Sequence, residues 1–92
     1  MVRLTEKQVA RISAAVAEPR RFKILKDLAS CGSSMACGKI VDKHGVSNAT
    51  ISHHLKELAE AGLIDIARDG KFASVQLRRD VWAAYVAHLA DL

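Results

Sequence analysis

One polar helix face within residues 47–62 holds the side chains best suited, by type and spacing, to recognising another molecule. Ser47 is a good helix N-cap, and Gly62 stands where a left-handed residue would end the helix. Between them Ile51, Leu55 and Leu58 recur at helical spacing and form an apolar stripe. Short polar side chains on the other face would let the helix enter a DNA major groove and hydrogen-bond base edges. An ordinary solvent-facing helix is the alternative. The polar face consists of Asn48, Ala49, Ser52, His53 and Lys56.

Positive charge is concentrated before this helix. The net charge is +4, and residues 1–46 carry nine Lys or Arg against four acids, while residues 47–92 carry five against six. Phosphate contacts are expected to flank base contacts in this way, although a generic basic surface would look the same. The basic residues form a larger group, Arg20, Arg21, Lys23, Lys26, Lys39 and Lys43, and a smaller one, Arg68 and Lys71.

Length and composition favour one small domain spanning residues 1–92. Half of the residues are apolar but only 4% are aromatic, which suits closely packed helices. A chain of this length has a modest core, which dimerisation would enlarge. No apolar run approaches the length of a membrane span, and the N-terminus lacks the apolar segment of a signal peptide, so we expect a cytoplasmic protein. Cys31 and Cys37 are therefore not expected to form a structural disulfide.

Two helices are predicted before residue 32. Thr5 and Gln8 have the spacing of a capping box, so a first helix should run to about Ala17. Pro19 suits the first turn of a second helix, because its fixed φ is already helical. The expected core face of that second helix consists of Phe22, Leu25, Leu28 and Ala29.

A short third helix is predicted from Met35 to His44, with Ser34 as its cap. Gly45 would close it, and Ser47 caps the next helix two residues later, which is the spacing of a helix-turn-helix. Its expected inner face consists of Cys37, Ile40, Val41 and His44.

The pattern changes from helical to extended after Gly62. Two alternating segments, residues 63–68 and 71–77, are separated by Asp69-Gly70, a strong hairpin signal. Arg68 and Lys71 would place positive charge at the tip of this two-stranded wing. The fold class is therefore mainly α with a β-wing, in the order α-α-α-α-β-β-α.

The last helix, residues 80–92, has a broader apolar face than a small domain needs. The surplus predicts a homodimer interface shared with the narrow stripe of the first helix. The predicted interface residues are Val9, Ile12, Val16, Val81, Trp82, Tyr85 and Leu89.

This arrangement resembles the ArsR/SmtB family of winged-helix transcriptional repressors. The resemblance is carried by residues 18–25, Glu-Pro-Arg-Arg-Phe-Lys-Ile-Leu, by residues 46–58, and by Ala-Gly-Leu-Ile at 61–64. It implies a homodimer with the first and last helices at the interface. It also implies that two reading helices enter successive major grooves of an imperfect palindrome, with half-sites roughly 34 Å apart.

The departures from the family pattern concern sensing. Family members that bind soft metals carry Cys-Val-Cys on the third helix, but Ala36 and Gly38 stand at those cysteine positions here. Another family site lies on the last helix, where Asp80 and His88 match only in part and Trp82 stands where a His is wanted. No metal site or cofactor is therefore expected, and no effector can be named.

Two thiols and two histidines leave narrower questions open. Cys31 and Cys37 could form a thiol switch. The simpler interpretation is that Cys37 is a small core residue and that Cys31 is a thiol at a helix end without a function of its own. His53 lies on the groove face, whereas His54 is expected to turn toward the third helix as a partly buried packing residue. No catalytic set is visible, so an enzyme is not expected.

The sequence therefore predicts a homodimeric, sequence-specific repressor that binds double-stranded DNA. One alternative is a winged helix used for protein contact without DNA binding, and another is a thiol-responsive repressor using Cys31 and Cys37. Ser47 would cap the reading helix. The residues expected to read or approach bases are Asn48, Ala49, Thr50, Ser52 and His53, and those expected on phosphates are Lys39, Lys43, Lys56, Arg68 and Lys71.

Overall fold

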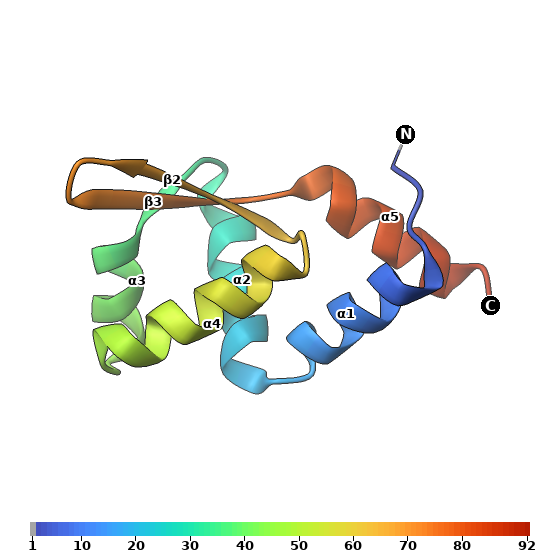
Figure 1. Cartoon of the computed structure of the whole chain (residues 1–92), viewed down its shortest axis with the longest axis horizontal. Coiled ribbons are helices and arrows are strands. Elements are labelled where there is room, and N and C mark those ends of the chain that lie inside the picture. Colours follow the sequence, from blue (N-terminus) through green and yellow to red (C-terminus); the bar gives the residue numbers. More distant parts are fainter. Residues whose placement is uncertain (1) are drawn as a thin grey trace.

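The computed structural model describes residues 2–92 and has the element order of a winged helix-turn-helix (Figure 1). α1 and α5 lie at one end of the long axis, and α3 and the wing tip lie at the other. The mainly helical fold class with a β-wing is confirmed. The elements are α1 Glu6–Val16, α2 Pro19–Cys31, β1 Met35–Ala36, α3 Cys37–His44, α4 Asn48–Glu60, β2 Ile64–Asp69, β3 Phe72–Leu77 and α5 Arg79–Ala90.

The predicted helix starts of α1 and α2 are confirmed. The Thr5 side chain accepts a hydrogen bond from the Gln8 amide at 3.1 Å, and the Gln8 side chain accepts one from the Thr5 amide at 2.7 Å. Pro19 occupies the first turn of α2, and the Glu18 carboxylate caps it by accepting from the Arg21 amide at 3.0 Å. Both starts depend only on neighbouring residues, which is why the sequence predicts them well.

The start predicted for α3 was wrong. Met35 and Ala36 form a short strand that pairs antiparallel with β3, Met35 opposite Val75 and Ala36 opposite Ser74. The helix therefore begins at Cys37 with Ala36 as its N-cap, and Ser34 does not cap it. Pairing with a strand almost 40 residues later holds this backbone extended, and a local pattern cannot predict that.

The wing turn lies one residue later than predicted. Asp69 is the last residue of β2 and pairs with Phe72, so the two-residue turn is Gly70-Lys71. Gly70 has a φ of 61°, which favours glycine, while Lys71 does not have positive φ. Glycine at the first turn position with the strands continuing on either side gives a tight hairpin.

The core face of α2 is rotated from the predicted one. Ile24, Leu25 and Leu28 are buried, with Ile24 fully so, whereas Phe22 is 43% exposed and Ala29 is also exposed. Leu25 and Leu28 were predicted correctly, but Phe22 and Ala29 were not. The buried side of α2 packs against α1, α4 and β3, so the direction in which α2 is buried depends on the whole fold.

Three residues predicted at the dimer interface pack inside the protomer instead. Ile12 is 1% exposed and Tyr85 is 6% exposed, and Val81 is likewise buried. The Tyr85 hydroxyl lies 2.8 Å from the Ser13 hydroxyl, which joins α5 to α1. A side chain that is already buried has little area left to give to a second subunit. A place at the dimer interface stays a prediction for these three residues, and the more exposed ones offer more area to a partner.

The other predicted interface residues keep some or much of their surface. Val9, Val16 and Trp82 are partly buried against the core. Leu89 is 43% exposed, and its neighbour Val86 is similarly exposed. Sequence periodicity alone could not separate the two groups, because one helix face serves both the core and the surface.

Ile24→Ala should lower the free energy of unfolding by about 2–5 kcal/mol, because it opens a cavity in a closed core. Phe22→Ala removes a larger side chain but should cost less than half as much, since much of that ring is in water. Urea denaturation at one fixed protein concentration would compare the two variants. Equal losses would contradict the rotation of α2 described here.

Candidate nucleic-acid interface

A tight turn joins α3 to α4. Gly45 has a φ of 64°, and its amide donates to the Val41 carbonyl at 3.0 Å, which closes α3. Ser47 then caps α4, because its hydroxyl accepts from the Thr50 amide at 3.1 Å. Only Val46 separates these two residues, so the predicted helix-turn-helix is present with its predicted cap.

α4 has one apolar and one polar face, as predicted. Ile51, Leu55 and Leu58 are buried in the core. On the other face, the exposed side chains from residue 48 to residue 56 include no acid, and the exposed Glu60 near the helix end pairs with Arg11. The first turns of α4 therefore leave a surface that a polyanion can approach. These exposed residues are Asn48, Ala49, Thr50, Ser52, His53 and Lys56.

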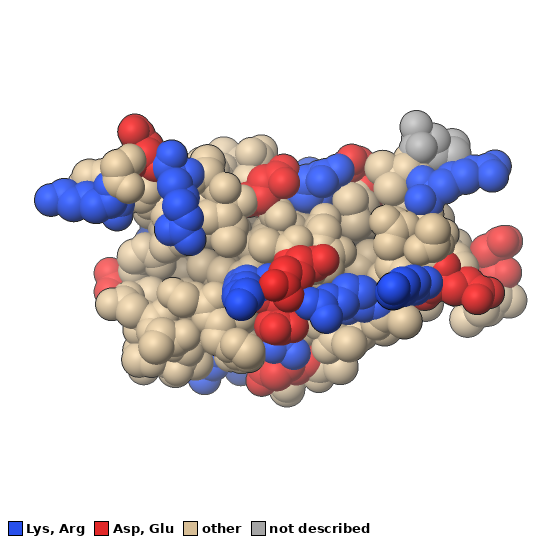
Figure 2. Space-filling view, in the orientation of Figure 1, with Lys and Arg blue, Asp and Glu red and all other residues tan. Residues whose placement is uncertain are grey.

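The wing adds cationic and aromatic side chains beside this face. Arg68 and Lys71 are exposed at its tip, and Figure 2 shows Lys and Arg side chains projecting there at the upper left. Phe72, which the sequence analysis did not single out, is 73% exposed at the same tip. An exposed aromatic ring beside two cations is a surface that can contact a groove or a partner.

The two predicted lysines of α3 differ in their surroundings. Lys39 is exposed and forms no ion pair among residues 2–92. The Lys43 ammonium lies 3.2 Å from an Asp27 carboxylate oxygen, so this side chain turns toward α2. Of the two, Lys39 is the freer to meet a phosphate.

His54 turns toward the start of α2 and not toward α3, which corrects the prediction. Its Nδ1 atom is 3.5 Å from an Arg21 guanidinium nitrogen and 3.8 Å from a Glu18 carboxylate oxygen. Burial lowers the pKa of His54, partly opposed by Glu18 and reinforced by Arg21. The hydrogen bond from the Arg21 amide lowers the pKa of Glu18. His54 is a partly buried packing residue, as expected, although in another direction.

The two cysteines are free thiols. Cys31 is exposed, and its Sγ donates to the Ser33 carbonyl at 2.9 Å. Cys37 is partly buried, and this burial raises the pKa of its thiol, with nearby Arg68 acting in the opposite direction. A raised thiol pKa reduces the thiolate fraction that oxidation requires. The thiol switch remains a prediction.

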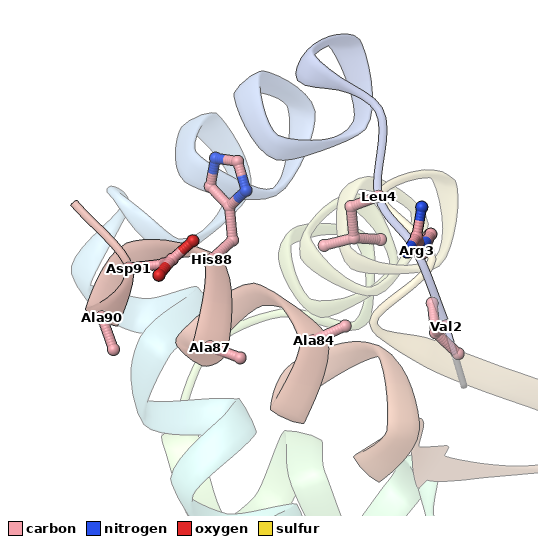
Figure 3. A pocket seen from close by; sticks show the side chains of 8 residues that line it. All are labelled: Val2, Arg3, Leu4, Ala84, Ala87, His88, Ala90 and Asp91. Carbon is pink, nitrogen blue, oxygen red and sulfur yellow. The ribbon is translucent and has the colours of Figure 1, made fainter.

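A hollow lies between the N-terminal segment and α5 (Figure 3). It is lined largely by small or apolar side chains, with His88 and Asp91 at its edge. Across the part of the chain that the structure describes, no group of three or more metal-ligating side chains comes together. None of the described helices is both long and apolar enough to cross a bilayer.

This architecture matches a known family. Residues 18–65, just over half of the chain and including the whole helix-turn-helix, fit the model of the bacterial regulatory proteins of the arsR family. The chain belongs to the ArsR family. The matched segment of this ArsR-family chain contains both motifs on which the resemblance rested, at α2 and at α4.

Similar proteins include characterised and uncharacterised regulators. The chain is 32% identical over 77 residues to the uncharacterised HTH-type regulator YceK of Bacillus subtilis, covering 84% of this chain and 77% of YceK. It is 39% identical over 67 residues to the transcriptional repressor SdpR of the same organism, covering 73% and 72%. It is 31% identical to an arsenical resistance operon repressor of Staphylococcus xylosus, covering 84% and 72%.

Solved structures share the fold over nearly the whole chain. One is the homodimeric winged helix-turn-helix DNA-binding domain of a possible ArsR-family regulator from Mycobacterium bovis, with a TM-score of 0.75 and 29% identity, covering 99% of this chain and 91% of that one. An ArsR-family regulator at 19% identity has a TM-score of 0.85 and covers 98% and 91%. The second likeness supports the fold alone.

Sequence reasoning missed the contacts that hold α4 in place. Arg11 of α1 pairs with Glu60 at 2.6 Å and lies 3.7 Å from Glu57, both on α4. Arg21 donates through Nε to the Ala15 carbonyl at 2.7 Å and also reaches α4 through His54. The partners that join α4 to α1 and α2 are separated by 49 and 33 residues, so the sequence offers only their charge or polarity as a signal.

The free energy of unfolding should decrease less in His54→Gln than in the parent protein as the pH falls below about 6.5. The folded state favours neutral His54. Below about pH 6.5, the ordinary pKa that His54 has in the unfolded chain, the unfolded chain therefore binds more protons than the folded protein does. Stability is therefore highest above that pH and falls until the pH passes the lowered pKa of the folded state. Urea denaturation at several pH values would measure this, with His88→Gln at an exposed position on α5 as the control. An unchanged pH slope in His54→Gln would contradict the assignment.

Proposed function

We propose that this protein is a homodimeric, sequence-specific DNA-binding repressor that acts on an imperfect palindrome in the cytoplasm. The observation that carries the proposal is the exposed face of α4, which is polar, free of acids over residues 48–56 and presented by a tightly capped helix-turn-helix. Membership of a family of regulatory proteins supports the same function.

The proposed contacts divide into two classes. Small and polar residues on the first two turns of α4 approach base edges, because their short side chains allow a close fit in the major groove. Cationic residues on α3, on α4 and at the wing tip neutralise phosphates and set the register. The base-proximal residues are Asn48, Ala49, Thr50, Ser52 and His53, and the phosphate contacts are Lys39, Lys43, Lys56, Arg68 and Lys71.

The proposed dimer uses exposed apolar surface on α5 together with part of α1. Val86 and Leu89 are large exposed side chains on α5, and Trp82, Val9 and Val16 keep part of their surface. The M. bovis domain, which covers nearly the whole chain, is homodimeric. A two-fold dimer would place two α4 helices about one DNA turn, roughly 34 Å, apart.

Ser52→Glu should abolish sequence-selective DNA binding without unfolding the protein, because it places a carboxylate on the exposed face of α4. Fluorescence anisotropy would compare DNA from the gene's own upstream region with scrambled DNA. Ser30→Glu, the same change at an exposed position on α2, should bind like the parent protein. For the parent, binding should weaken with salt at a log-log slope near about −0.9 per phosphate neutralised.

The outcomes of that titration separate the alternatives. Normal operator binding by Ser52→Glu would show that α4 is not the reading helix. Weak, equal binding of the parent protein to both DNAs would favour the protein-contact alternative. A change in the affinity for operator DNA on adding reductant would support a thiol switch formed by Cys31 and Cys37.

Leu89→Asp should shift the protein from dimer to monomer, since it buries a charge in the proposed interface. Ala87→Asp adds the same charge at an exposed position on another side of α5 and should leave the dimer intact. Sedimentation velocity at micromolar concentration would distinguish the two. A dimeric Leu89→Asp protein would place the interface elsewhere.

A further inference from the structure

A basic hollow lies between α2 and α3, apart from the exposed face of α4. Its volume is about 480 Å³, within the range of small-molecule sites. We call it the α2–α3 hollow. It is lined by Arg20, Lys23, Lys26, Asp27, Lys43 and His44.

The charge of this hollow is unbalanced. Four cationic side chains face one carboxylate, a net charge of +3 with His44 neutral. That carboxylate, Asp27, is already engaged by Lys43 at 3.2 Å and by His44 at 2.9 Å. Among residues 2–92, Lys23 and Lys26 have no acidic group within 4.0 Å. Arg20, Lys23 and Lys26 follow one another three residues apart, and like charges at that spacing destabilise a helix. An anion bound in the hollow would reduce the repulsion among them.

A histidine with a nearly buried side chain lines the hollow. The side chain of His44 is only 7% exposed, and its Nε2 atom faces an Asp27 oxygen that can only accept, so Nε2 carries the proton. Nδ1 of His44 is then free to accept a hydrogen bond from Arg20 Nη1 at 3.4 Å. Arg20 Nη1 also donates to the His44 carbonyl at 3.2 Å. The Arg20 guanidinium is thus held in place while its Nε and Nη2 donors have no partner among the described residues.

We propose that the α2–α3 hollow binds a small free anion that carries phosphate groups. Arg20 supplies a fixed, planar pair of donors, the geometry that suits phosphate oxygens, and Lys23 and Lys26 supply mobile point charges. The sequence shows the same arrangement, since Arg20, Lys23 and Lys26 follow one another at a spacing of three residues along α2.

The position of the hollow favours a free anion over the DNA backbone. α2 meets α4 at His54, which lies about 140° around an ideal helix from Ala49 on the exposed face. The basic side of α2 therefore does not continue the surface proposed to meet bases. Lys43 alone belongs both to the hollow and to the proposed phosphate contacts, and its ammonium is turned toward Asp27. It does adjoin the turn before α4, because Arg20 holds the last carbonyl of α3.

Titration of the full chain with sodium pyrophosphate, followed by amide NMR at constant ionic strength, tests the proposal. We expect saturable shifts at Lys23, Asp27, His44 and Gly45. The double variant Lys23→Gln/Lys26→Gln should bind about tenfold more weakly or worse, since it loses two charge-assisted contacts. Arg3→Gln/Lys7→Gln removes the same charge from exposed positions on the N-terminal segment and α1 and should bind like the parent.

The opposite results would overturn the proposal. Shifts that never saturate, or equal weakening in both double variants, would mean that only diffuse positive charge attracts the anion. If pyrophosphate does not bind but Lys23→Gln/Lys26→Gln reduces the salt slope of operator binding by about 1.8, the hollow meets the DNA backbone instead. The pyrophosphate titration contains no DNA, so its outcome is independent of the proposed repressor function.

Discussion

Burial of one side of α4 is the constraint on which the proposed interface depends. Ile51, Leu55 and Leu58 lie in the core, and fully burying an aliphatic side chain of this size contributes roughly 1.5–3 kcal/mol. Rotating the helix by one residue would bring Ser52 into the core and a leucine into water. The polar face therefore points outward because the opposite, apolar face is held in the core.

Other contacts fix the two ends of the same helix. At the start, Gly45 closes α3 and Ser47 caps α4, so the entry angle is set by two neighbouring residues. At the end, Arg11 reaches across from α1 to Glu60. An exposed ion pair contributes little stability, but it joins the end of the molecule proposed to dimerise to the helix proposed to read DNA.

The sequence predicts the structure well where neighbouring residues decide it. The cap at Thr5, the position of Pro19, the glycine at residue 45 and the wing all lie at or next to their predicted positions. It fails where distant segments meet. β1 exists because β3 pairs with it, and Ile24 replaces Phe22 in the core because several elements surround α2. The exposed face of α4 could be predicted from periodicity, but the network of Arg20, Asp27 and His44 could not, since it needs two helices in contact.

The burial of Ile12 and Tyr85 within one protomer also bears on how this protein would respond to its own concentration. These residues complete a core within one protomer, and a protomer that folds on this core alone would not have to wait for a partner. Folded monomers can then accumulate before they pair. For a repressor that binds only as a dimer, operator occupancy would rise with the square of protomer concentration below the dimerisation constant, which gives a sharper threshold than an obligate dimer allows.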